Sequence, residues 1–139
     1  MTTDTQTGIP AGVKRVIINF LGLTKGGTGD TLIQIGPSGG VATTGYAGGG
    51  RGGGTSTSGI YPATSWSGFG ATSGSIVLEL AEVSSNTWTW HGALYGGGYM
   101  APVSGYVALS GALERILITD AGGSPGNFSA GSWQVSYQT

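Results

Sequence analysis

Glycine interrupts this chain so often that few segments are long enough to form a helix. The chain holds 30 glycines in 139 residues, and only 8% of its residues are charged, against about 25% in an average globular protein. Glycine loses more backbone entropy in a helix than other residues do, and the uncharged polar residues that must cover such a surface favour turns and strands. The sequence therefore predicts an all-β protein.

The segments between the glycine-rich stretches have the composition of short strands. They are rich in valine, isoleucine, threonine and aromatic residues, and clusters of glycine, asparagine, serine and proline separate them. About eight such segments, with no helical pattern between them, predict an antiparallel β-sandwich that is jelly-roll-like. The expected strands lie at residues 14–23, 31–35, 41–46, part of 60–71, 75–83, 87–95, 103–109, 113–119 and 132–137.

Alternation of apolar residues indicates which side chains face the core. The first long segment places Val16, Ile18 and Phe20 on one face. Ile17 and Leu21 lie on the other face, which predicts a central strand buried on both sides over part of its length.

Two later segments alternate in the same way. Residues 87–95 are expected to form a hairpin with residues 75–83, through a turn at residues 84–86. The side chains expected in the core are Trp88, Trp90 and Leu94 of this hairpin and Trp133, Val135 and Tyr137 of the last segment.

Residues 1–139 are expected to form a single domain, because a chain of this length fits one hydrophobic core. Residues 1–8 are predicted to be a polar lead. Residues 48–59, GGGRGGGTSTSG, show no apolar period and are predicted to be a long surface loop.

The charge balance limits the partners that this chain can attract. The net charge is −1 and the isoelectric point is near 5.6, which disfavours binding to nucleic acid and makes association with further copies electrostatically easy. There is no cysteine, so stability is expected to come from packing. The longest apolar stretch, residues 16–23, is too short to span a membrane, and we expect no membrane insertion.

Three sequence patterns resemble catalytic or nucleotide-binding motifs. Residues 36–40 and 122–126 match G-x-S-x-G, and residues 48–53 match G-x-G-x-x-G. The first motif needs a helix after the serine, and the second needs a strand, a helix and a further acidic residue. None of the three has that context, so we interpret them as turns and loops.

The ionisable residues do not suggest a metal or catalytic centre. His91 is the only histidine, and Glu79 and Glu82 lie three residues apart on an expected strand, which points them to opposite faces. We predict no catalytic residues, no metal and no cofactor, and we interpret His91 as a surface or interface residue. The sequon at residues 127–129 has no expected role, because no secretory signal precedes it.

Aromatic residues in or beside the glycine-rich segments are the candidate binding residues. Aromatic rings stack on the C–H faces of sugars and also dominate contacts between proteins. Segments 46–66 and 95–100 are expected to cluster at one end of the sandwich, where they bind a ligand or a neighbouring subunit. The candidate ligand-binding residues are Tyr46, Arg51, Tyr61, Trp66, Tyr95 and Tyr99.

Six segments resemble a module found at the C-termini of phage tail fibre and related virion proteins. The pattern TGIPAGVKR followed by LIQIG is the most specific of them, and together the segments extend over nearly the whole chain. They are residues 7–15 (TGIPAGVKR), 32–36 (LIQIG), 43–46 (TTGY), 86–88 (NTW), 110–119 (SGALERILIT) and 128–137 (FSAGSWQVSY).

This resemblance implies a homotrimeric β-sandwich, assembled in the host cytoplasm and displayed on the outside of the virion beside other virion proteins. It does not imply hydrolysis. Its expected target is host surface polysaccharide or protein. The chain departs from the module in the glycine insertion at residues 48–54 and in beginning at Met1 with a short polar lead. A capsid or baseplate decoration protein is therefore the alternative, and an enzyme that acts on surface polysaccharide is the third hypothesis.

Overall fold

The computed structural model describes residues 4–25, 31–50, 55–61, 71–96, 98–120 and 128–139. Within these ranges the chain forms ten strands and no helix, and every strand pairing is antiparallel. The predicted all-β antiparallel class is confirmed: seven of the expected strands form, and three short strands were not expected. Of the strand expected within residues 60–71, residues 62–70 lie outside the described ranges. The strands are β1 (Asp4–Gln6), β2 (Arg15–Lys25), β3 (Thr31–Gly36), β4 (Ala47–Gly50), β5 (Thr55–Ser56), β6 (Thr72–Glu82), β7 (Thr87–Gly96), β8 (Tyr99–Ala108), β9 (Arg115–Asp120) and β10 (Phe128–Gln138).

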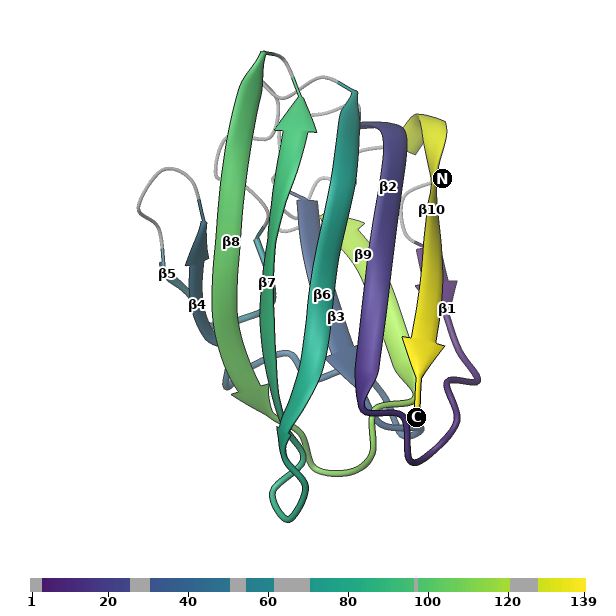
Figure 1. Ribbon diagram of the computed structural model, residues 1–139, viewed down its shortest axis with the longest axis vertical. Helices are drawn as coiled ribbons and strands as arrows, with labels where there is room; N and C mark the ends of the chain where they lie inside the picture. Colours follow the sequence, from purple (N-terminus) through teal and green to yellow (C-terminus); the bar gives the residue numbers. More distant parts are fainter. Residues whose placement is uncertain (1–3, 26–30, 51–54, 62–70, 97, 121–127) are drawn as a thin grey trace.

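The strands form two sheets that pack face to face as a sandwich (Figure 1). One sheet has three strands in the order β1-β9-β3, and the other has seven in the order β10-β2-β6-β7-β8-β4-β5. Strands β1 to β4 alternate between the two sheets, whereas β6, β7 and β8 follow one another as a meander in the larger sheet. Side chains on the outer face of the larger sheet, such as Tyr95 and Tyr106, are exposed.

The core lies between the inward faces of the two sheets. Trp88, Trp90 and Leu94 are fully or almost fully buried, as their alternation predicted, and they share the β7 face that contacts the smaller sheet. The β6–β7 hairpin also forms as predicted. Further core residues are Val16, Ile18, Phe20, Ile33, Ile35, Ile76, Leu78, Val103, Val107, Ile116 and Ile118.

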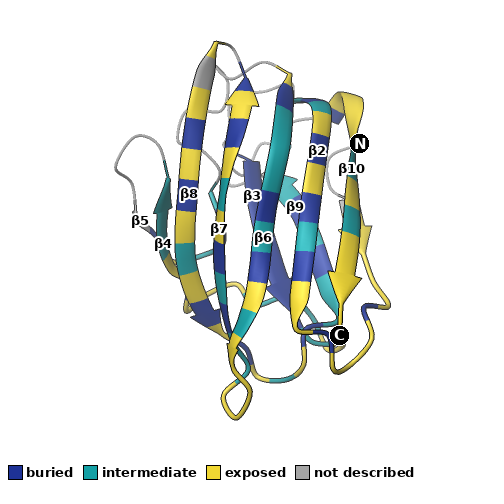
Figure 2. Cartoon of the chain, in the orientation of Figure 1, coloured by how far each residue is buried: buried dark blue, intermediate teal, exposed yellow. Residues whose placement is uncertain are grey.

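Strand β2 is internal to its sheet, as predicted, because it pairs with β10 on one side and β6 on the other. The prediction that both of its faces are buried is wrong. Ile17 is only partly buried, and the Leu21 side chain is 71% exposed on the outer face. Bands of buried and exposed residues alternate along β2, β7 and β8 in Figure 2, since one face packs on the core and the other meets solvent.

The glycine-rich segment at residues 48–59 is not simply a surface loop. Its described residues include most of β4 and all of β5, and β4 pairs with β8 along four residues. Glycine is needed in this strand because of the Trp90 indole: a Cβ on Gly48 would lie 2.6 Å from the Cζ2 atom of that ring. Glycine leaves room for that ring and still supplies the backbone hydrogen bonds of a strand.

Two further predictions about the chain's extended segments are wrong. The predicted polar lead at residues 1–8 contains β1, which pairs with β9 from Asp4 to Gln6. Residues 41–46 form no strand. They instead run beside the free edge of β3, where the Ala42 N–H donates to the Ile35 carbonyl at 2.9 Å. The first segment covers an edge of β9 and the second covers an edge of β3. The alternation of apolar residues within one segment cannot show which distant strand that segment will cover.

Candidate functional site

Many of the described strand ends gather at one end of the sandwich, the upper end in Figure 1. The end of β2 pairs with the starts of β10 and β6, and the end of β7 pairs with the starts of β6 and β8. The start of β3 and the end of β9 also pair there. We call this the upper end and define it by Thr31, Thr72, Tyr95, Met100 and Phe128. Binding residues often lie at such an end, because a rigid sheet positions them.

Exposed apolar side chains form a row across the outer face of the larger sheet at the upper end. Tyr95 and Met100 pair directly and are 62% and 67% exposed. Ser73 pairs with Tyr95 on the other side, and its hydroxyl accepts the Gly22 N–H at 2.9 Å, beside the exposed Leu21. We call Leu21, Tyr95 and Met100 the outer row. Large apolar side chains grouped in this way mark interaction surfaces more often than isolated ones do.

A second feature of the upper end is a distortion where β2 meets β10. The pairing shifts twice between Phe128 and Ser132, and β2 shifts against β6 over the same stretch. Gly22 and Gly131 have φ angles of 61° and 84°, which other residues adopt at a cost. A β-bulge of this kind bends a strand and redirects its side chains.

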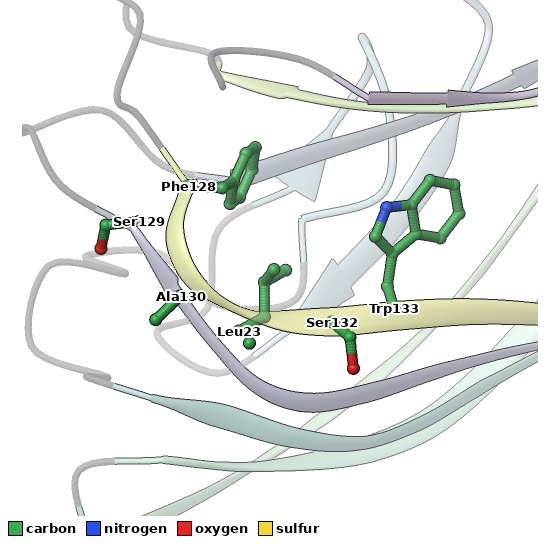
Figure 3. Close-up of a pocket in the computed structure, with 7 residues that line it drawn as sticks. Leu23, Phe128, Ser129, Ala130, Ser132 and Trp133 are labelled. Atoms are coloured by element: carbon green, nitrogen blue, oxygen red, sulfur yellow. The ribbon is translucent and has the colours of Figure 1, made fainter.

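The bulged strands line an open pocket of about 340 Å³. In Figure 3 the side chains of Leu23, Phe128 and Trp133 point to the same side of the ribbon, and Ser132 points away from them. The pocket is lined by Leu23, Phe128, Ser129, Ala130, Gly131, Ser132 and Trp133. None of these residues is ionisable, so the pocket offers aromatic and aliphatic surface with serine hydroxyls and backbone groups. Such a surface suits a neutral, hydroxyl-rich ligand better than a charged one.

Tyr46 was expected to be an exposed binding residue, and the structure places it in the core. It is 2% exposed, and its ring lies 5.9 Å from the Trp90 ring, at an angle of 55°. Its hydroxyl accepts the Ile35 N–H at 2.9 Å and can donate to the Ala42 carbonyl at 2.9 Å or the Ile35 carbonyl at 3.1 Å. Tyr46 therefore closes the edge of β3 and is unavailable to a ligand.

Burial raises the pKa of Tyr46 from 10.0 to about 12, and the hydrogen bond to the Ile35 backbone opposes this rise. The unfolded phenol loses its proton near pH 10, whereas the folded one keeps it until about pH 12. Stability should therefore fall as pH rises through this window, by about 2 to 3 kcal/mol from this residue.

We expect Tyr46→Phe to lower the free energy of unfolding near pH 7 by about 2 kcal/mol, because the Ile35 N–H loses a buried partner. The gap between the wild type and the variant should narrow above pH 10, since phenylalanine has no proton to lose. Denaturant unfolding of both proteins between pH 7 and pH 12 measures this gap, and parallel curves would contradict the assignment.

The other candidate residues are not brought together by the described structure. Tyr95 lies in the outer row and is exposed, as predicted. Tyr61 is partly buried and follows Ile60, which pairs with Ile33 beside the smaller sheet, so it does not share a face with Tyr95. Tyr99 begins β8, but its side chain is not among those described, and Arg51 and Trp66 lie outside the described residues.

The pocket was not predicted from the sequence, although a local signal for it exists. Trp133, Val135 and Tyr137 were assigned to the core face of the last strand. Trp133 and Val135 are only partly buried, and Tyr137 is 45% exposed. The missed signal was the pair of glycines, one at position 22 and one at position 131, each inside an otherwise regular strand. An isolated glycine in a strand often marks a bulge.

The remaining motif residues have ordinary surroundings where they are described. His91 is exposed on the outer face of β7. Residues 37–40 form a turn in which the Gly40 N–H donates to the Pro37 carbonyl at 3.1 Å, while residues 122–126 and Asn127 lie outside the described ranges. Among the residues that the structure describes, no three histidine, aspartate or glutamate side chains are grouped as metal ligands would be. In the same residues there is no helix of the length and apolar character that crossing a membrane requires.

The chain was compared with known protein families, with curated proteins and with solved structures. No family, no curated protein and no solved structure matches it. A functional assignment therefore depends on the geometry of the upper end and on the chemistry of its side chains.

Proposed function

We propose that this chain is a structural module of a bacteriophage particle, at a tail fibre tip or in a receptor-binding domain, that recognises a glycan on the host cell surface. The observation that carries the proposal is the chemistry of the upper end. There the uncharged pocket places Trp133 beside Phe128 and Leu23 on the core-facing side of the larger sheet. The sequence resemblance to virion tip modules gives the biological setting.

The binding chemistry follows from these side chains. A sugar ring has a C–H face that packs on an aromatic ring and hydroxyls that exchange hydrogen bonds with serine and backbone groups. Because the pocket lining has no ionisable group, a neutral sugar enters it without leaving a buried charge unpaired.

Binding is tested with the purified chain on a glycan array and on a panel of intact bacteria, with free surface polysaccharide as competitor. Saturable binding that the polysaccharide displaces is expected. We expect Trp133→Phe to weaken this binding, by up to about tenfold, because phenylalanine keeps a ring but has a smaller stacking face than indole. Trp88→Phe is the matched control, because Trp88 is buried in the core away from the pocket, and its affinity should stay unchanged.

Two results would reject the proposal. One is an absence of binding to any cell or glycan at high protein concentration. The other is binding that Trp133→Phe leaves unaltered. Electron microscopy of labelled particles distinguishes a receptor-binding tip from the alternative, a decoration protein. A decoration protein would lie around the capsid or baseplate and not at a distal tip.

A further inference from the structure

Strand β10 forms an open edge of the larger sheet. It runs from Phe128 to Gln138, and among the described strands it pairs only with β2. Beyond the bulge its pairing is regular from Ser132 to Gln138, a length of about 24 Å at the usual rise of a strand. The strand contains no charged residue and no proline. An edge of this kind is a template for pairing with another strand.

The other described edges are short or covered. β1 has three residues and β5 has two. The free side of β3 is covered, because Ile33 exchanges two backbone hydrogen bonds with Ile60, at 2.9 and 2.7 Å. The Ile35 N–H donates to the Tyr46 hydroxyl. Proteins commonly protect their edges in these ways. Among the described strands, β10 therefore differs in having a long edge with no strand paired to it.

We propose that β10 pairs antiparallel with β10 of a second copy of this chain, so that the two larger sheets become one continuous sheet across a twofold axis. An antiparallel strand edge is complementary to itself under a twofold rotation, since each residue meets its partner in the same pattern of donors and acceptors. Because β10 has no charged residue, no like charges face each other across this contact. The net charge of −1 per chain adds little repulsion.

The side chains of β10 give this contact an apolar contribution. Val135 and Tyr137 face the same side as the core, yet Val135 is partly exposed and Tyr137 is 45% exposed. A second β10 beside them would cover both, because residues opposite each other in antiparallel strands point to the same face. On the other face, Gln134 and Ser136 are exposed and would lie near their counterparts. This inference does not depend on the proposed function, and it differs from the homotrimer that the sequence resemblance implies.

The test uses charges placed on the edge. Wild type, Gln134→Lys/Ser136→Lys and Gln134→Glu/Ser136→Glu are compared by analytical ultracentrifugation over roughly 1 to 200 μM, where weak dimers dissociate. We expect the wild type to dimerise and each variant alone to dissociate with a Kd at least about tenfold higher, since like charges then face each other. An equimolar mixture of the two variants should dimerise again, because opposite charges then meet.

A matched control carries the same charges elsewhere on the outer face. Ala93→Lys/Ser104→Lys changes exposed residues of β7 and β8, which lie inside the sheet, and should dimerise like the wild type. Circular dichroism checks that every variant is folded. The proposal is overturned by a wild type that stays monomeric, by a trimer of constant mass, by a dimer that the edge charges leave intact, or by a mixture that does not reassociate.

Discussion

Gly105→Ala is expected to lower the free energy of unfolding by about 3 kcal/mol or more, although it adds a single methyl group. A Cβ at Gly105 would lie 2.5 Å from the Ala47 carbonyl oxygen and 2.5 Å from the Gly48 Cα, and it would also clash with the Trp90 ring. Two of these contacts are backbone atoms of the paired strand, so they cannot move without separating β4 from β8. The indole of Trp90 is held in the core and has no space to retreat.

The matched control for this prediction is Gly39→Ala. Gly39 is an exposed turn residue, and a Cβ added there meets nothing within 4 Å. This variant should change stability by less than about 1 kcal/mol, or raise it slightly because alanine restricts the unfolded chain. Denaturant unfolding followed by tryptophan fluorescence measures both variants. If Gly105→Ala were as stable as Gly39→Ala, Trp90 could not be packed against β4 and β8 as described.

Gly131→Ala is expected to cost about 3 kcal/mol and to disrupt the pocket. Its φ angle of 84° strains an alanine by about 1 to 2 kcal/mol. An added Cβ would also clash with the Gly22 carbonyl and lie 2.5 Å from the Leu23 N atom, which adds about 1 to 3 kcal/mol of overpacking. Relief of the clash requires β10 to move away from β2. That movement displaces the pocket lining, so glycan binding should fall together with stability.

Gly98→Ala separates the two causes. Gly98 has a φ angle of 80°, almost the same as Gly131, but a Cβ there meets nothing within 4 Å. The free energy of unfolding of Gly98→Ala should therefore fall only by the cost of backbone strain, about 1 to 2 kcal/mol. Equal losses in the two variants would show that the close approach of Gly131 to Gly22 has no energetic role. Unfolding curves and glycan affinity at a temperature where both variants are folded give the comparison.

The success of the strand predictions has a local cause. In a strand, successive side chains point to opposite faces, so the two-residue spacing of Trp88 and Trp90 is enough to predict that they share a face. Most predicted strands therefore lie within a few residues of their observed positions, and the β6–β7 hairpin forms around the predicted turn. The depth of burial was less predictable, because it depends on what packs above each face. Tyr137 shows this, since it faces the correct side but lies at the open edge.

The errors concern segments whose conformation is set by partners distant in sequence. Gly48 and Gly49 have no apolar side chain to show a period, yet both pair with β8, and the missing Cβ of Gly48 leaves room for the Trp90 ring. Tyr46 lies among small and polar residues that suggested exposure, but its hydroxyl is required at the edge of β3. Neither partner can be identified from the residues near Tyr46 or Gly48 in the sequence.

The sequence by itself determined the all-β class, the antiparallel sandwich and the inward faces of the long strands, because glycine content and two-residue alternation act within each segment. Only the tertiary structure decided which strands lie at the edges, where β2 and β10 bulge, and that Leu21, Tyr95 and Met100 share one exposed row. The physical reason is that strand order and register are fixed by hydrogen bonds and packing between distant segments, and these exist only after the chain has folded.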